Sequence, residues 1–193
     1  MMNSFDQDQA SAGGSRPGIV AAAVLRAACS SARMSEAFIA RASGVSKDTI
    51  RSWADGTCAL ASVAVWQLER LEAALLTAGA EPALVADLGP AAWCDLVLEA
   101  IAAGEDTRLL LADPVAGTSA FRELLAWAVA GRVPARYRRY SPSGPLLADS
   151  AAARRAIKAL GPLAGVPRRA RGRCANRRRR QRPESFPRCH RRS

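Results

Sequence analysis

Aromatic residues make up only 5% of this 193-residue chain, and runs of β-branched residues are nearly absent. Large sheets are built mainly from such residues, so their scarcity argues against a β-rich fold. Hydrophobic residues nevertheless reach 49%, and many of them are alanine, a strong helix former that buries little area. The composition therefore predicts an all-α protein in which the packing between helices is thin.

Histidine occurs once, at His190, and the chain contains no phosphate-binding glycine loop. Catalytic schemes based on histidine need that residue held by a folded scaffold, and His190 lies in an arginine-rich terminal segment. Cys174, Cys189 and His190 lack a fourth zinc ligand, and their spacing matches no common zinc site. We therefore expect no enzymatic activity, no cofactor and no metal site.

The five cysteines form no C-x-x-C pair, and their odd number does not suggest a disulfide framework. A reducing, cytoplasmic location fits this pattern best. The apolar stretches are interrupted by charged residues before they reach the length of a membrane span. We therefore expect a cytoplasmic protein without a membrane partner.

Positive charge is concentrated at one end of the chain. Residues 167–193 hold twelve arginines and one acid, so they alone account for the net charge of +11, and the rest of the chain is balanced. Such a segment binds any polyanion without choosing a sequence. It would reinforce DNA binding, or it is a solvated extension without a selected role.

The distribution of helical periodicity, glycine and proline divides the chain into four parts. We predict a disordered segment over 1–17, a first helical domain over 18–80, a helical accessory domain over 90–160 and a disordered basic tail over 161–193. Amphipathic spacing and capping residues predict helices over 18–31, 36–42, 47–54, 62–78, 91–103, 119–130 and 146–160.

The second and third predicted helices have the pattern of two short helices joined by a tight turn. Ala40 is small enough for a close approach between them, and Gly44, four positions later, suits a backbone with positive φ. Bulky apolar residues that we expect to point inward flank this turn, and polar residues occupy the opposite face. The inward set is Ile39, Val45, Ile50 and Trp53.

These residues resemble the lambda-repressor/Cro-like family of helix-turn-helix DNA-binding domains. The likeness is carried by Ser35-Glu36-Ala37-Phe38-Ile39-Ala40, Ser43-Gly44-Val45-Ser46, Thr49-Ile50-Arg51-Ser52-Trp53 and Asp55-Gly56, and extends more loosely from Val20 to Leu75. It implies a bacterial transcription regulator whose third helix enters the major groove of double-stranded DNA. Regulators of this architecture commonly bind two half-sites as dimers, so a homodimer is a second partner to consider.

The resemblance also implies roles for individual residues. Lys47, Thr49 and Arg51 are the candidates for base or phosphate contacts. Ser35 and Ser46 would present helix N-termini to phosphates, Arg41 would add a backbone contact and Ser52 would share the outward face. Two positions depart from the family pattern: Glu36 stands where glutamine is common, and Ala54 follows the tryptophan where glutamate is common.

Two other functions remain open at this point. The acids Glu36 and Asp55 favour a helical protein-interaction module, antitoxin-like or scaffold, that retains the fold without base readout. The basic tail alone would give non-specific nucleic-acid binding. A second basic and aromatic cluster, residues 136–140, resembles a surface for phosphates or bases, but we interpret it as a solvated loop between helices.

Overall fold

The computed structural model describes residues 18–140, 144–147 and 150–160, and over these ranges the chain is helical and contains no β-strand. This confirms the predicted all-α class. The segments 1–17 and 161–193, for which the sequence predicts disorder, lie outside the described residues. The α-helices are α1 (Ile19–Ser31), α2 (Glu36–Ser43), α3 (Lys47–Ala54), α4 (Val65–Thr77), α5 (Pro82–Val85), α6 (Leu88–Ala103), α7 (Arg108–Ala112), α8 (Ser119–Ala130) and α9 (Ser150–Leu160).

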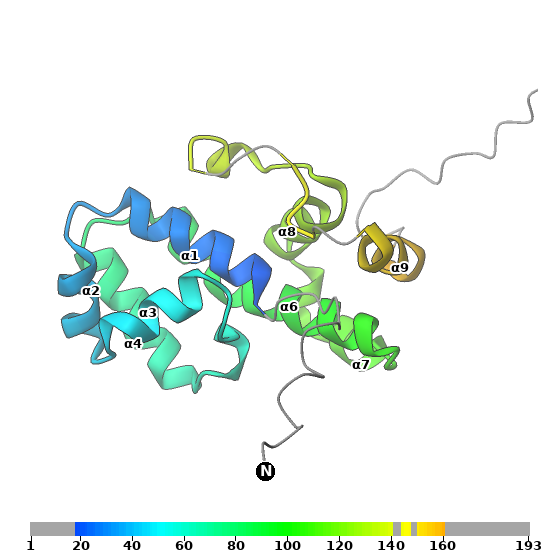
Figure 1. Ribbon diagram of the computed structural model, residues 1–193, viewed down its shortest axis with the longest axis horizontal. Helices are drawn as coiled ribbons and strands as arrows, with labels where there is room; N and C mark the ends of the chain where they lie inside the picture. Colours follow the sequence, from blue (N-terminus) through cyan, green and yellow to red (C-terminus); the bar gives the residue numbers. More distant parts are fainter. Residues whose placement is uncertain (1–17, 141–143, 148–149, 161–193) are drawn as a thin grey trace, which may run out of the picture.

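Helix α6 lies between two groups of helices. Figure 1 shows α1 to α4 gathered at the left and α7 to α9 at the right, with α6 between them. Helix α6 packs against α1 on one side and against α8 and α9 on the other. The buried apolar residues form one continuous cluster from Val20 to Leu160, and this cluster crosses the boundary predicted between 18–80 and 90–160.

Helix α1 is buried on nearly all sides. Val20, Val24, Leu25 and Ala28, which the sequence places on one apolar face, are all buried, and so are most of the alanines between them. Because alanine side chains are short, neighbouring helices can approach the axis of α1 closely. This helix therefore forms the centre of the α1–α4 group and also contacts α6.

The first turn of α1 is capped from a distant part of the chain. Gly18 precedes the helix and has no side chain to accept from its free N–H groups, which every helix start leaves without partners. The carboxylate of Asp95, in α6, accepts hydrogen bonds from the N–H groups of Val20 and Ala21, each at 2.9 Å. Burial raises the pKa of the Asp95 carboxyl to about 7, while these two hydrogen bonds act in the opposite direction.

The observed helix boundaries match the predicted ones best where a capping residue is present. Helices α3 and α8 begin and end at the predicted residues, and Ser46 and Thr118 cap them. Helix α4 begins at Val65, three residues later than predicted, because a turn of 3-10 helix occupies Leu60–Ser62. Helix α9 begins at Ser150, later than its predicted start at 146.

The segments between the predicted helices contain additional short helices. The connection predicted over 79–89 includes α5, one helical turn that begins at Pro82 and buries Leu84 and Val85. Residues 109–111, which are ambiguous between strand and helix in sequence, belong to α7. Helix α6 begins three residues before the predicted start at Ala91 and contains Pro90 in its first turn, as expected.

Tryptophans on α6 and α8 differ in burial. The buried residues of α8 include Phe121, Leu124, Leu125, Trp127 and Ala128. On α6, Val97 and Ile101 are buried, whereas Trp93 and Leu96 are only half-buried. The indole N–H of Trp93 donates to the carbonyl of Leu110 at 3.0 Å. Trp93 therefore joins α6 to α7 instead of filling the core.

The interpretation of residues 136–140 as a solvated loop is wrong for Arg136 and Tyr137, whereas Arg138 and Arg139 are exposed. Tyr137 is fully buried, with its ring 5.0 Å from that of Trp127. Its hydroxyl donates to Asp87 at 2.6 Å, and Nε of Arg136 donates to the same carboxylate oxygen at 2.5 Å. Arg139 donates to Glu81. The segment is held by partners about fifty residues away, which no local pattern reveals.

Candidate nucleic-acid interface

The α2–α3 turn has the backbone geometry that the sequence predicts. Gly44 ends α2 with φ of 74°, in the left-handed region that favours glycine, and the N–H groups of Gly44 and Val45 donate to the carbonyl of Ala40. A Cβ atom at position 44 would lie 2.7 Å from Nη2 of Arg70, which extends over the turn from α4. The left-handed conformation therefore favours glycine here, and an added side chain would also displace the end of Arg70.

The predicted inward residues hold the two helices together. Ile39, Ala40, Ile50 and Trp53 are buried, and Val45 is half-buried. Ile50 and Trp53 are three positions apart on α3, so they lie on the same side of the helix, and this side faces the core. The opposite side of α3 is therefore exposed as a polar face.

The structure places the seven candidate residues around this face but in different roles. Lys47 and Arg51 are exposed on α3, and Arg41 is exposed on α2. Ser35 and Ser46 are exposed and cap α2 and α3: their hydroxyl oxygens accept hydrogen bonds from the N–H groups of Phe38 and Thr49, at 3.3 and 3.0 Å respectively. Both serines thus lie at helix N-termini, as predicted.

Thr49 and Ser52 are less available than the sequence suggests. Both are half-buried. The Thr49 hydroxyl lies 2.7 Å from that of Ser46, so the two hydroxyls already bind each other. The carbonyl of Ser52 accepts from the N–H and hydroxyl groups of Thr57 and from the N–H of Cys58. Ser52 therefore contributes mainly to the loop that follows α3.

Four charged side chains form a cluster across α2 and α3, which we call the α2–α3 charge cluster: Glu36, Lys47, Asp48 and Arg51. Oε2 of Glu36 lies 3.7 Å from Nζ of Lys47 and 3.4 Å from Nε of Arg51. Nη1 of Arg51 lies 3.8 Å from Oδ1 of Asp48. Glu36, which stands where the family pattern commonly has glutamine, thus pairs with both cations of α3.

The ion pairs of this cluster are loose. None of its four side chains makes a side-chain hydrogen bond within the part of the chain that the structure describes. Exposed pairs of this kind contribute about 0–1 kcal/mol, so little energy opposes their separation. The guanidinium donors of Arg51 and the carboxylate acceptors of Asp48 consequently remain free to bind an incoming partner.

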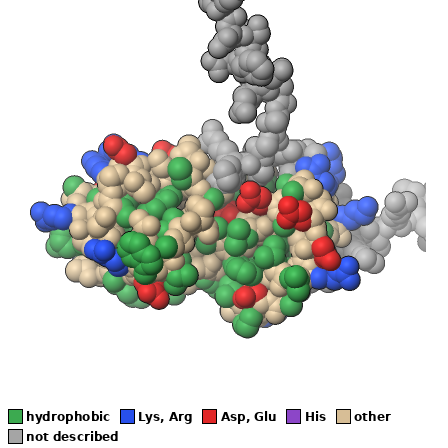
Figure 2. Space-filling model, turned by 90° about the horizontal axis from the view of Figure 1, so that it is seen from below, with side chains coloured by type: hydrophobic (Ala, Val, Ile, Leu, Met, Phe, Trp, Pro, Cys, Tyr) green, Lys and Arg blue, Asp and Glu red, His purple; other side chains and the backbone are tan. Residues whose placement is uncertain are grey.

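Net charge does not distinguish this face from the rest of the folded chain. Arg41, Lys47 and Arg51 are balanced by Glu36, Asp48 and Asp55. Figure 2 shows one side of the molecule on which basic and acidic side chains are scattered among apolar ones without a continuous basic patch. Attraction to phosphates therefore depends on individual side chains, together with the arginines of residues 167–193.

Two residues outside the predicted set position α3. Nη1 of Arg26, on α1, donates to the carbonyl of Ala54 at the end of α3. Arg70, on α4, lies over the turn before α3. Neither residue belongs to the α2–α3 sequence pattern. Their positions on the preceding and following helices carry no local signal of this role.

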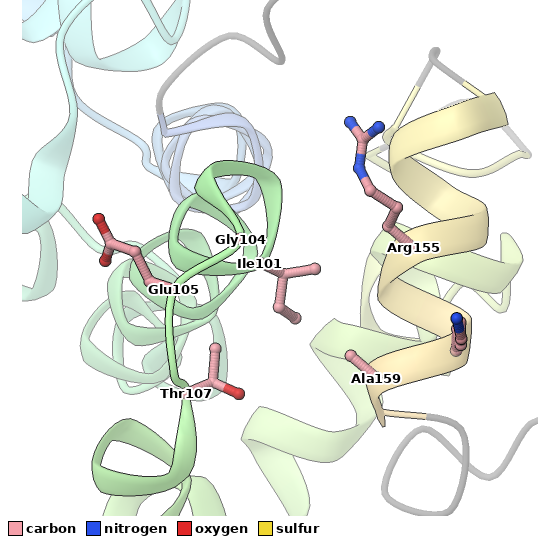
Figure 3. A pocket seen from close by; sticks show the side chains of 7 residues that line it. Ile101, Gly104, Glu105, Thr107, Arg155 and Ala159 are labelled. Atoms are coloured by element: carbon pink, nitrogen blue, oxygen red, sulfur yellow. The ribbon is translucent and has the colours of Figure 1, made fainter.

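A pocket of about 350 Å³ lies between the end of α6 and α9, outside the α2–α3 face. In Figure 3, Ile101, Thr107 and Ala159 face one another across it, Arg155 extends toward the gap and Glu105 turns away from α9. Its volume is near the lower end of the range for small-molecule sites. Neither Trp93 nor Trp127 lines it.

Comparison with known proteins provides no relative: no family model, no curated protein and no solved structure matches this chain. Over the described residues, no three His, Cys, Asp or Glu side chains are grouped to hold a metal ion. Cys174, Cys189 and His190 lie outside these residues. No helix in the described part of the chain is long and apolar enough to cross a membrane.

Proposed function

We propose that this protein is a sequence-specific DNA-binding transcription regulator whose α2–α3 pair acts as a helix-turn-helix. The observation that carries this proposal is the exposed polar face of α3, on which Lys47 and Arg51 keep all their hydrogen-bond donors while Ile50 and Trp53 anchor the helix from behind. A groove-binding helix needs such a rigid base and a polar outer face.

The chemistry of the face supports DNA over a protein partner. Charged side chains are depleted at the centres of protein–protein interfaces, whereas Lys47, Asp48 and Arg51 dominate the outward side of α3. Arginine and lysine donate to O6 and N7 of guanine, the commonest specific contact in the major groove. Arg41, exposed on α2, would reach the adjacent phosphates.

The pairing of Glu36 with Lys47 and Arg51 favours a second candidate, a protein-interaction module without base readout. In that function the carboxylate would permanently neutralise both cations and suppress attraction to phosphates. The two functions differ in a direct way: DNA binding needs the side chains of Lys47 and Arg51 to leave Glu36, and the interaction module does not.

A binding experiment across salt concentrations separates these functions from binding by the tail. Three full-length proteins are compared on a duplex library: the natural chain, Lys47→Ala with Arg51→Ala, and a variant with glutamine at the twelve arginines of 167–193. We expect the glutamine variant to keep its sequence preference with a smaller salt dependence, and the double variant to lose its preference. The absence of any preference in the natural chain would contradict the proposal.

A further inference from the structure

Asp48 is the most exposed member of the α2–α3 charge cluster and the one whose role the proposed function leaves open. Its side chain is 91% exposed, against 34% for Glu36. It lies in the first turn of α3, and the first residues of a recognition helix are those that approach base edges. A carboxylate at this position must either be tolerated near DNA or make a favourable contact there.

Asp48 and Arg51 present an acceptor beside a donor. They are three positions apart on α3, and Oδ1 of Asp48 lies 3.8 Å from Nη1 of Arg51. Glu36 faces the Nε side of the guanidinium, so the edge formed by Nη1 and Nη2 is left for another partner. The distance between Oδ1 and Nη1 is too long for a hydrogen bond, and both groups therefore retain their binding capacity.

A guanine–cytosine pair presents the complementary pattern in the major groove. Guanine offers the acceptors O6 and N7, which arginine binds, and cytosine offers the N4 amino donor, which aspartate accepts. O6 and N4 are hydrogen-bonded to each other within the pair, so the groups that bind them must be only a few ångströms apart. Arg51 and Asp48 meet this requirement.

We propose, building on the DNA-binding function above, that Asp48 and Arg51 together select one G·C pair, with Arg51 donating to guanine and Asp48 accepting from the N4 amino group of cytosine. Asp48 is then a specificity-determining residue: it disfavours thymine at the cytosine position, because thymine O4 would face the carboxylate as a second acceptor.

The test uses the full-length protein in a selection from a random duplex library, followed by affinity measurements on the selected site. We expect the natural chain to require a G·C pair. In Asp48→Ala, the ratio of affinities for this pair over the other base pairs should fall about tenfold. Asp55→Ala is the matched control, since Asp55 is an exposed acid at the end of the same helix. It removes the same charge and should leave base preference unchanged.

A modified duplex tests the contact without changing the protein. Replacing cytosine by 2-pyrimidinone, which lacks the amino group, should lower the affinity of the natural chain about tenfold and that of Asp48→Ala much less, each relative to its own unmodified duplex. Equal losses for both proteins, or an unchanged base preference in Asp48→Ala, would overturn the role of Asp48 and leave the DNA-binding function intact. A natural chain that selects no sequence would instead refute the DNA-binding function itself.

Discussion

Two regions of this molecule, the α2–α3 face and the segment after α8, differ in whether their arginine side chains are hydrogen-bonded within the fold. On the α2–α3 face, Arg51 faces two carboxylates at 3.4 and 3.8 Å and makes no hydrogen bond with either. In the 3-10 turn Ala135–Tyr137, after α8, Arg136 donates to Asp87 and Glu123, and the neighbouring Tyr137 is buried. The difference separates an arginine whose donors are available to a partner from one whose donors are used within the fold.

The largest loss of stability is expected from a substitution in the hydrogen-bonded region around Arg136. Asp87→Ala leaves the Arg136 guanidinium and the Tyr137 hydroxyl without their shared acceptor, so we expect the free energy of unfolding to fall by about 3–5 kcal/mol. Urea denaturation measures this change. Asp48→Ala, which removes an exposed partner of Arg51, should change stability by less than about 0.5 kcal/mol. Similar losses for both variants would show that the acids of the two regions contribute equally to stability.

Asp95 is a second buried acid that is hydrogen-bonded within the fold, and its contribution to stability depends on pH. Because burial raises the pKa of its carboxyl from 3.8 to about 7, the neutral carboxyl contributes stability that is complete below pH 3.8 and is lost as the pH rises through 7. We expect the stability of the natural chain relative to Asp95→Asn to fall by about 2–4 kcal/mol between pH 4 and pH 8. Denaturation curves that stay parallel over this range would show that Asp95 is ionised throughout.

A substitution in the turn between α2 and α3, next to the exposed polar face, should give a smaller loss of stability. Gly44→Ala places a side chain at φ of 74°, which costs about 1–2 kcal/mol, and also displaces the guanidinium of Arg70. Gly104→Ala is the matched control, because Gly104 has φ of 77° and no atom within 4 Å of the added Cβ. We expect Gly44→Ala to be the more destabilising in thermal melts. Equal losses would exclude a contribution from Arg70.

The smallest effect comes from exchanging one arginine partner in each region. Glu36→Gln removes a negative charge beside Lys47 and Arg51, so we expect DNA affinity to rise about threefold with stability changed by less than about 0.5 kcal/mol. Glu123→Gln should lower stability by about 1 kcal/mol and leave DNA affinity unchanged. A loss of affinity in Glu36→Gln would show that its charge is needed to hold Arg51 in place.

Local pattern was sufficient for most of the fold and for the geometry of the candidate site. Alanine content and amphipathic spacing predict the all-α class, and capping serines and glycines predict the bounds of α3 and the bend at Gly44. These features depend on residues a few positions apart. A sequence pattern of that range can therefore specify them.

Contacts between distant residues were not predictable in this way. Asp87 and Asp95 look like ordinary surface acids of a helix, and only their partners, fifty and seventy-five residues away, explain their burial. Residues 136–140 look exposed for the same reason. Within the site, the bond from the Thr57 hydroxyl to the carbonyl of Ser52 depends on the loop after α3, and the pairing of Glu36 with Arg51 depends on how α2 and α3 are placed relative to each other.

The capping of α1 by Asp95 restricts how this chain can be divided. A fragment that stops after α4 would leave the N–H groups of Val20 and Ala21 without an acceptor and would uncover the side of α1 that faces α6. We therefore expect the amino-terminal helices to be poorly suited to transfer into other proteins as a portable unit. Any rearrangement that preserves them must also carry α6.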